Sequence, residues 1–338
     1  MRELGVHLGN PIDDWIMDKI TRRFFTGISR IAAFCKRPTS RVLDAVNGFG
    51  GAALALLNSQ RSFRYELVVG AIFRDEAEYL DEWLRFHRSV GVDHFYLYDN
   101  GSNDRPVEAL QEWIESGHVT LIDWPGDAAQ RSAYNDCIRR FRSEARWVAF
   151  IDIDEFLYSP RGRDLKIQLS DYSDVAAVFV YWVLFGSSGH VSKPSGSIIE
   201  NYTYCLDLET ANDSPPLKAK LVTGRVRQGK CIVNPRLVRK YGVHLPESTW
   251  TGLTLDENRQ PPASKTPESR MTADVFRINH YWSKSIEELV RKVRRGSGAK
   301  GKSAVRIEKD FLAWEQELNV AQDLTLQKIW RGPWTGRR

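Results

Sequence analysis

The chain has 338 residues, of which 42% are hydrophobic and 11% aromatic, and its formal net charge is +5. This is enough apolar material for one large α/β domain or for two smaller domains. The positive charge lies at the two ends, because residues 1–62 carry +4 and residues 284–338 carry +6, which leaves −5 for the middle. An acidic centre argues against a nucleic-acid-binding core, so we expect no nucleic-acid partner.

The cysteines are far apart in the sequence and form no CxxC pair (Cys35, Cys137, Cys205 and Cys231). They give no metal-site or redox signal and fit a reducing compartment. There is no run of about 18 apolar residues, so no transmembrane helix is expected. The first residues lack the apolar core of a signal peptide. We therefore expect a cytoplasmic protein.

Residues 1–62 are predicted to form a helical N-terminal extension, with helices around residues 15–35 and 41–57. Arg22, Arg23 and Arg30 accompany the apolar stripe of the first helix. A basic amphipathic helix can lie on the anionic inner face of a membrane, which would make the protein peripheral to it. It can equally pack on the main domain with its basic face in water, and both interpretations stay open.

Residues 65–185 alternate between apolar strand patterns and helical patterns. Asp104 is predicted to cap a helix that starts at Pro106. The other predicted elements are strands at 66–73, 95–98, 119–124, 147–153 and 175–185 and helices at 76–90 and 128–144. This alternation predicts a Rossmann-like, mostly parallel α/β sheet flanked by helices, whose ligands bind beyond the carboxyl ends of the strands.

The sequence after residue 186 is rich in loops. Ser285 and Glu288 form a capping box that opens a helix running to about Arg295. Short β segments are expected near residues 198–206, 218–226, 230–239 and 274–281. We expect a main domain at residues 63–300, with a first half at 63–160 and a second half at 161–283, followed by a basic helical tail at 301–338.

The most informative segment runs from Trp147 to Leu157, where three carboxylates interrupt an apolar strand: Asp152, Asp154 and Glu155. Burying an unpaired carboxylate is costly, so acids at the end of such a strand usually face a cation or a cleft. On an extended backbone, Asp152 and Asp154 would point to the same side. Two oxygen ligands on one side suit Mg²⁺ or Mn²⁺. The alternative is a strand that runs into an acidic, solvated turn.

Polar residues also follow the first two predicted strands. Arg74 and Glu76 come after the first, and Asp99 and Asn100 after the second. A nucleotide needs hydrogen-bonding partners for its base edge and ribose, and Asp99 or Asn100 would suit. An ordinary Asx-rich turn explains the segment from Asp99 to Asp104 equally well.

Six segments of the chain resemble glycosyltransferase family 92 and its family 2-like relatives. In chain order they are Phe73–Leu84, Gly91–Ser102, Gln130–Cys137, Phe150–Phe156, Phe185–His190 and Asn279–Ser285. The resemblance covers roughly residues 65–300. It implies an A-type glycosyltransferase fold, in which an Asp-x-Asp motif holds a divalent metal against the diphosphate of a sugar nucleotide.

By match of position, Asp152 and Asp154 would be this pair, and the nucleotide side would include Arg74, Asp99, Gln130 and Asn135. The implied reaction moves a sugar from a nucleotide-sugar donor, such as a UDP-sugar, to a hydroxyl group of a glycan, a glycolipid or another acceptor, with inversion. Animal and plant members carry a transmembrane anchor, which this sequence lacks, so a cytosolic relative acting in polysaccharide biosynthesis is one expectation.

A late histidine often supplies a further metal ligand in A-type enzymes, and neutral imidazole suits Mn²⁺. We favour His280 over His244, because the basic segment after His280 could hold the diphosphate through Lys284, Arg291 and Arg295. Either histidine could instead be structural, and the basic segment could be a solvated helix face.

The catalytic base and the acceptor site are expected after residue 186. Glu200 is the preferred base, with Asp207 and Glu209 as alternatives, while Asp154 acts through the metal. Trp182, Phe185 and His190 are the expected acceptor wall, although Trp182 and Phe185 could be core residues.

Two other functions fit part of the pattern. Haloacid-dehalogenase-type phosphatases also place Asp-x-Asp after a strand, but they need Thr or Ser two residues beyond the second Asp, where this chain has Phe156. A non-catalytic nucleotide-sugar-binding protein would keep the same residues as the transferase.

Overall fold

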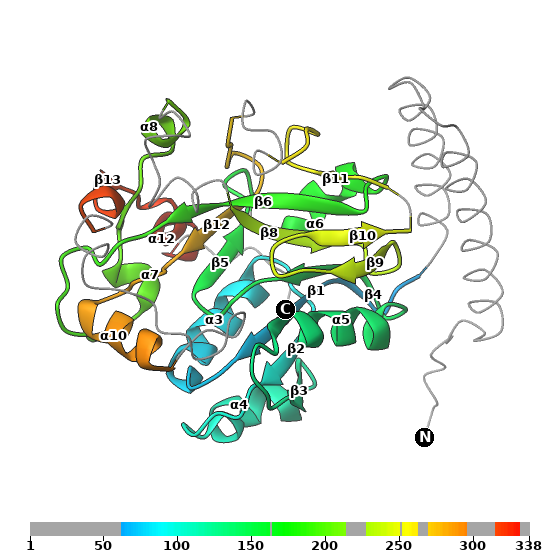
Figure 1. Cartoon of the computed structure of the whole chain (residues 1–338), viewed down its shortest axis with the longest axis horizontal. Helices are drawn as coiled ribbons and strands as arrows, with labels where there is room; N and C mark the ends of the chain where they lie inside the picture. Colours follow the sequence, from blue (N-terminus) through cyan, green and yellow to red (C-terminus); the bar gives the residue numbers. More distant parts are fainter. Residues whose placement is uncertain are drawn as a thin grey trace.

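The structure, a computed structural model, describes residues 62–162, 164–213, 228–250, 252–262, 270–295 and 315–331. In this part of the chain a nine-stranded sheet forms the centre of the molecule, with helices around it (Figure 1). Its strand order is β3-β2-β1-β4-β8-β6-β12-β5, and β11 pairs with β6. The predicted N-terminal helices and the predicted strand at 218–226 lie outside the described residues.

One half of the sheet is parallel. It contains β3 (Val119–Asp123), β2 (His94–Asp99), β1 (Tyr65–Phe73) and β4 (Ala145–Phe150), which are joined by α3 (Ala77–Ser89), α4 (Pro106–Glu115) and α5 (Gln130–Phe141). Seven consecutive residues of β1 are buried, as expected for a strand covered on both faces. The predicted Rossmann-like class and the order of its first elements are confirmed.

The other half of the sheet mixes directions. β8 (Gly229–Val233) runs antiparallel between β4 and β6 (Ala177–Leu184), and β12 (Arg277–His280) lies parallel to β6 and antiparallel to β5 (Glu155–Tyr158). The remaining strands are β7 (Tyr204–Cys205), β9 (Val238–Tyr241), β10 (Pro246–Thr249), β11 (Thr254–Leu255) and β13 (Ala321–Gln322). The sheet as a whole is therefore mixed, with mostly parallel pairs.

The short helices cover the second half of the sheet and its loops. They are α6 (Leu165–Leu169), η1 (Ser170–Tyr172), α7 (Ile198–Asn201), α8 (Leu208–Asp213), α10 (Ile286–Arg295) and α12 (Thr325–Arg331). The predicted β segment at 198–206 is wrong for its first part, because Ser197 caps a helical turn there by accepting a hydrogen bond from the Glu200 amide. Within the described ranges, no helix has the length and apolar character to span a membrane.

The turn between β4 and β5 differs from the sequence prediction. The strand expected at 147–153 ends at Phe150, and a turn follows in which the Glu155 amide donates to the Asp152 carbonyl at 3.0 Å. Asp152 and Asp154 therefore lie on a turn between two strands, not on an extended segment. The expectation of an extended backbone from Asp152 to Asp154 is wrong.

Two predicted helix starts have different outcomes. The capping box before α10 is confirmed, since the Ser285 amide donates to Glu288 at 3.1 Å and the Glu288 amide donates to the Ser285 hydroxyl at 3.2 Å. The predicted cap of α4 is wrong: the carboxylate of Asp104 accepts a hydrogen bond from the Ala77 amide at 2.7 Å. Asp104 thus places negative charge at the N-terminus of α3, where the helix dipole favours it.

The C-terminal segment packs onto the main domain. β13 pairs with β7, and Leu318 and Leu326 are buried in the core. Residues 315–331, which the sequence analysis grouped with a tail, therefore share the hydrophobic core of the sheet.

Candidate active site

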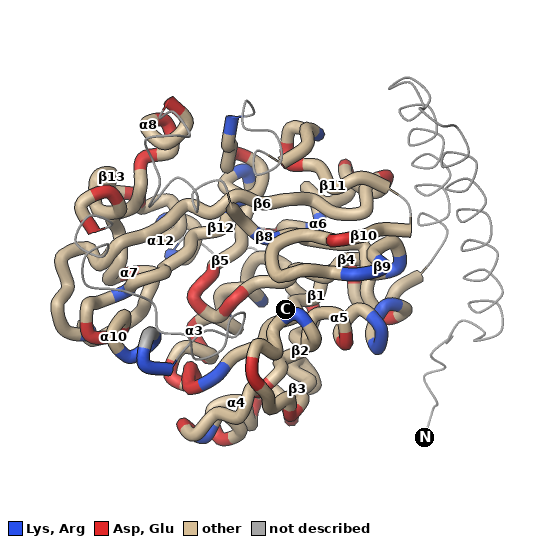
Figure 2. The backbone as a smooth tube through the Cα atoms, in the orientation of Figure 1, with Lys and Arg blue, Asp and Glu red and all other residues tan. Residues whose placement is uncertain are grey.

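A buried group of possible metal ligands lies where β5 meets β12. Asp154, Glu155 and His280 each offer a ligand atom, and these atoms all lie within 4.8 Å of one another. The antiparallel pairing of β5 with β12 sets His280 opposite Glu155 in register, so two segments far apart in the sequence meet here. Figure 2 shows the acidic residues at the start of β5 and the basic residues along α10.

The group formed by Asp154, Glu155 and His280 has the chemical features of a divalent-cation site. Glu155 Oε1 and His280 Nδ1 are buried and have no hydrogen-bond partner among the described residues. Unpaired buried polar atoms are uncommon in folded proteins and call for an explanation such as a missing ion. Two carboxylates and one imidazole are ligands that Mn²⁺ accepts, so the residues fit a divalent cation.

Asp154 is almost fully buried and lies between Lys292 and the imidazole ring of His280. Its carboxylate pairs with Lys292 of α10, and its Oδ1 lies 3.6 Å from His280 Nε2. Burial opposes ionisation, but Lys292 and His280 together hold the pKa of Asp154 well below its usual value. Burial lowers the pKa of His280, so the ring is neutral and able to bind a metal.

Glu155 is completely buried beside Asp154. Burial raises the pKa of its carboxyl group well above the usual value, which the charge of Lys230, 3.9 Å away, only partly offsets. A carboxyl group in this state becomes a good ligand once a cation replaces the missing solvation.

Asp152 has a different set of partners. Its carboxylate accepts hydrogen bonds from Gln130 at 2.7 Å, from the Tyr134 hydroxyl at 3.0 Å, and from Lys230 at 2.9 and 3.0 Å. Burial raises the pKa of Asp152, but the charge and hydrogen bonds of Lys230 outweigh it and hold the pKa below the usual value. Its side chain remains 32% exposed. The first aspartate of the motif is therefore held by protein donors, whereas the second belongs to the metal-capable group.

Lys230 was missed by the sequence analysis. It lies on β8 and its side chain is only 1% exposed. Gly229 before it lets β8 approach β6 closely, because a Cβ atom there would lie 1.9 Å from the Val180 carbonyl oxygen. A lone lysine at the start of the apolar run Gly229–Val233 was the available signal.

Among the three predicted phosphate-binding residues, Lys284 lies nearest to the acids. Its side chain is buried, and its ammonium group lies 4.3 Å from the centre of the Tyr79 ring. It has no hydrogen-bond acceptor among the described residues. Burial lowers its pKa, although the charge of Asp154 opposes this. Lys284 is thus a buried lysine whose ammonium group could bind an anionic ligand.

The other two predicted phosphate-binding residues already have protein partners. Arg295 donates to the Arg74 carbonyl at 2.6 Å and to the Glu76 carboxylate at 3.0 Å, which ties α10 to the end of β1. Arg291 pairs with Glu78 at 3.2 Å on the surface. Lys292 of α10, which is not among the predicted phosphate-binding residues, pairs with Asp154.

The predicted nucleotide residues are divided between the site and the scaffold. Gln130 contacts Asp152, as described above. Asp99 accepts a hydrogen bond from the Ser102 amide at 2.9 Å, which is the Asx turn of the alternative interpretation. Asn100 donates to the Trp124 and Gly126 carbonyls and holds that loop.

Arg74 and Asn135 also have positions that the structure defines. The Nε atom of Arg74 is buried without a hydrogen bond, 3.8 Å from the Asp75 carboxylate, at the end of β1. Asn135 donates to the Tyr241 carbonyl and accepts from its amide, so it ties α5 to β9.

Trp182 packs against His280 of the metal-capable group. Its ring centre lies 4.5 Å from that of His280 and 5.2 Å from that of His244. His244 is within hydrogen-bonding distance of the Gly229 carbonyl through Nδ1, and burial lowers its pKa to about 4. His244 lies outside the group formed by Asp154, Glu155 and His280.

The other predicted acceptor residues are not gathered at the acids. Phe185 is buried in the core, with its ring centre 4.8 Å from that of Tyr281. His190 accepts a hydrogen bond from the Ile286 amide through its carbonyl group and so anchors the start of α10. Glu200 is about half exposed and pairs with Arg331 at 2.8 Å.

The carboxylates of the alternative bases, Asp207 and Glu209, also have protein partners away from the acids. Asp207 accepts hydrogen bonds from the amide and hydroxyl groups of Thr210, and Glu209 pairs with Arg270. The structure therefore brings together Asp152, Asp154, Gln130, Lys284 and His280 from the predicted set. It adds Glu155, Lys230 and Lys292.

The chain is similar to several known glycosyltransferases. The chain is 34% identical over 152 residues to a glycosyltransferase family 92 protein of Ricinus communis, an alignment that covers 41% of this chain and 26% of that protein. It is 33% identical over 108 residues to a galactan beta-1,4-galactosyltransferase of Arabidopsis thaliana, covering 29% of this chain and 22% of the relative. The chain thus spans about a quarter of the length of these curated relatives.

Among solved structures, the chain is distantly similar to S. aureus TarS in complex with UDP. The identity is 12%, the alignment covers 54% of this chain and 52% of TarS, and the TM-score is 0.33. The similarity to Mycobacterium tuberculosis glucosyl-3-phosphoglycerate synthase, with Mn²⁺, UDP and product bound, has 15% identity, covers 39% and 48% of the two chains, and has a TM-score of 0.27.

The family model named Glycosyltransferase family 92 matches residues 69–311, which include the parallel half of the sheet, the β4–β5 turn and α10. This match and the sheet topology confirm the predicted A-type fold. The chain belongs to glycosyltransferase family 92.

Proposed function

We propose that the protein transfers a sugar from a nucleotide-sugar donor, most simply a UDP-sugar, to a hydroxyl group of a glycan or glycolipid, with the help of Mn²⁺ or Mg²⁺. Family membership supports the reaction class, and the galactan galactosyltransferases among the relatives support a saccharide acceptor. Inversion at the anomeric carbon follows from the family resemblance and is part of the same proposal.

The observation that carries the proposal is the convergence of Asp154, Glu155 and His280 with two lysines around them. These three residues would hold the cation, which supplies positive charge to the leaving nucleoside diphosphate. Lys284, a buried ammonium group with no acceptor in the described part of the chain, would add a second positive charge near Asp154.

Asp152 would act on the donor through its hydrogen-bonded position. Gln130, Tyr134 and Lys230 fix the carboxylate and keep it ionised, so its exposed edge is an acceptor for a ribose or sugar hydroxyl group. Because three donors set its orientation, little conformational freedom is lost when the donor binds.

The direct test is release of UDP from UDP-sugars in the presence of Mn²⁺, with EDTA as the metal-free control. We expect slow release without an acceptor, no release with EDTA, and loss of metal-dependent UDP binding in Asp154→Asn and in Glu155→Gln. Asp207→Asn, which changes an exposed carboxylate, is the matched control and should behave like the wild type. UDP binding that is equally tight with and without metal in all variants would refute the proposed site.

The same assay separates the alternative functions. Hydrolysis of a generic phosphate ester without nucleotide release would indicate a phosphatase, although Phe156, at the position where such enzymes need a hydroxyl group, is a buried core residue. Tight nucleotide binding without turnover on any acceptor would indicate a binding protein.

A further inference from the structure

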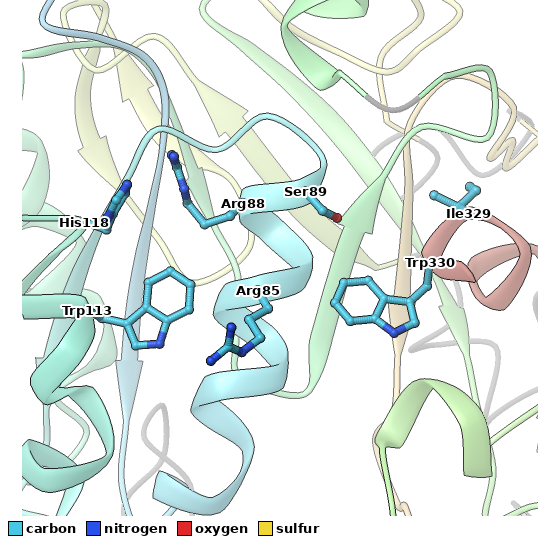
Figure 3. A pocket seen from close by; sticks show the side chains of 7 residues that line it. All are labelled: Arg85, Arg88, Ser89, Trp113, His118, Ile329 and Trp330. Atoms are coloured by element: carbon cyan, nitrogen blue, oxygen red, sulfur yellow. The ribbon is translucent and has the colours of Figure 1, made fainter. Parts of the chain in front are cut away.

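A second site lies at the far end of α3 from the acids. It is a pocket of about 420 Å³ between α3, α4 and α12, within the size range of small-molecule sites (Figure 3). It is lined by Arg85, Arg88, Ser89, Trp113, His118, Ile329 and Trp330. Nothing in the proposed transfer reaction uses these residues.

Two tryptophans form opposite walls of the pocket. Figure 3 shows Trp113 of α4 and Trp330 of α12 on either side of Arg85. The Trp113 indole nitrogen donates to Asp81 at 3.2 Å, and the Trp330 ring lies 5.9 Å from that of Phe86. Both indoles are therefore held in place while part of each ring stays open to water. Flat, rigid and partly exposed rings suit the apolar face of a sugar ring, which stacks on aromatic side chains through dispersion contacts.

Two arginines line the pocket, and they differ in their partners: Arg85 pairs with Asp81 at 2.7 Å, whereas Arg88 contacts mainly backbone carbonyl groups. Arg88 donates to the carbonyl oxygens of Val92 at 2.6 Å and Asp93 at 3.0 Å, but no ion pair to a carboxylate is formed by Arg88 among the described residues. The nearby carboxylate of Asp93 pairs with Lys166. No acidic residue lines the pocket. A half-buried guanidinium group whose nearest carboxylate is already paired with a lysine favours an anionic ligand.

We propose that this pocket binds an acidic saccharide unit of a glycan, with the sugar ring against an indole and the carboxylate toward Arg88. Arg85 and Arg88 lie six and nine residues beyond Tyr79, which touches Lys284, so the pocket is about 9–14 Å along the helix from the donor side of the candidate active site. If the proposed transfer is correct, the pocket holds a part of the acceptor chain remote from the growing end. Binding itself does not depend on that reaction.

The test measures binding of oligogalacturonate to the full chain in the absence of nucleotide and metal. Calorimetry and tryptophan fluorescence are the two readouts. Oligogalactose of the same length is the uncharged comparison. We expect the acidic oligosaccharide to bind more tightly, and Trp330→Ala and Arg88→Gln each to weaken its binding at least about tenfold. Arg105→Gln, which removes an exposed arginine of the α4 start, should leave binding unchanged.

Two further variants guard against misfolding. Trp330→Phe keeps an aromatic contact with Phe86 and should retain part of the affinity, and Arg88→Lys keeps the charge. Equal affinity for the neutral oligosaccharide, or no binding of either oligosaccharide, would overturn the proposal. So would a polyglutamate peptide that binds as tightly as the oligogalacturonate, because charge alone would then explain the interaction. Since nucleotide and metal are absent, a failed transferase assay would not affect these outcomes.

Discussion

Lys292 forms an ion pair with the Asp154 carboxylate, which is one of the proposed metal ligands. Its ammonium group pairs with Asp154 and donates to the Trp282 carbonyl at 3.0 Å. A divalent cation bound by Asp154, Glu155 and His280 would have to replace this ammonium group at Asp154. The substitution Lys292→Met removes the competitor while keeping a side chain of similar length, so we expect tighter binding of Mn²⁺ in the absence of nucleotide.

The magnitude follows from the strength of the pair. A hydrogen bond between charged groups contributes a net 1.5–3 kcal/mol as a rough range. The Lys292 side chain is 26% exposed, so water screens the pair and the lower end of that range applies. About 1.5 kcal/mol corresponds to roughly tenfold in the dissociation constant of Mn²⁺.

The assay is calorimetric titration of the metal-free protein with Mn²⁺, then with UDP at saturating Mn²⁺. In the second titration Lys292→Met should bind UDP more weakly than the wild type. In the wild type, the metal displaces the Lys292 ammonium group from Asp154, and this group can then contact the diphosphate, whereas the variant has no such group. Lys166→Met is the matched control, since Lys166 forms a comparable half-buried pair with Asp93 at 3.0 Å, remote from the acids. An unchanged or weaker affinity of Lys292→Met for Mn²⁺ would refute the reasoning.

Three other changes have defined outcomes. Lys230→Met leaves Asp152 without its buried counter-charge and should lower the free energy of unfolding by about 3–5 kcal/mol in urea denaturation, whereas a loss below about 1 kcal/mol would contradict the buried pair. Burial lowers the pKa of His87 from 6.5 to about 3, so the unfolded chain takes up the proton first as pH falls through 6.5, and stability drops by up to about 1.4 kcal/mol per pH unit. His87→Gln should flatten the dependence of the urea midpoint on pH between about pH 7 and about pH 5, and an unchanged slope would show that other groups cause it. Glu200→Gln should keep the transfer rate within about twofold, because Glu200 pairs with Arg331 on the surface, while a fall of roughly 10²-fold or more would identify Glu200 as the base after all.

The parallel half of the fold was predictable because its signals are local. The buried run of β1 and the apolar spacing of α3 each specify one element without reference to the rest of the chain. The sequence predicts a β segment near residues 230–239, which only partly matches β8. The position of β8 between β4 and β6 could not be predicted, because it depends on pairing between distant segments. For that reason Lys230 could be seen in the sequence, but not its position beside Asp152.

The outcome for Asp104 shows a related limit. A carboxylate just before Pro106 has the spacing of a helix cap, and the sequence contains nothing that distinguishes α4 from another helix start nearby. In the fold, the loops after β1 and β2 lie side by side, because these strands are parallel neighbours. The side chain of Asp104 therefore reaches the Ala77 amide of α3 at 2.7 Å.

His280 was selected from the sequence because a basic helix follows it, and the structure brings it to the acids for a different reason. The register of β12 on β5 sets His280 opposite Glu155, and the Tyr281 amide donates to the Asp154 carbonyl at 2.9 Å. Any shift of β12 by one residue would turn the imidazole to the other face of the sheet. The same register also brings α10, which follows β12 directly, close enough for Lys292 to reach Asp154.

The turn after β4 gives the two aspartates separate roles, and this depends on where the strand ends. If β4 had continued through residue 153, Asp152 and Asp154 would have shared one face and one set of partners. Because the chain reverses after β4, the Asp152 carboxylate contacts Lys230 of β8 and Gln130 of α5, while the Asp154 carboxylate contacts His280 of β12 and Lys292 of α10. Glu155 lies between them, since its carboxylate is 3.9 Å from Lys230 and belongs to the metal-capable group. In the proposed function, a metal at Asp154 would lie next to lysines that could hold a diphosphate, and Asp152 would orient the remainder of the donor. The motif therefore requires the turn as much as the two carboxylates, since the spacing of two residues alone would place both acids on the same ligand.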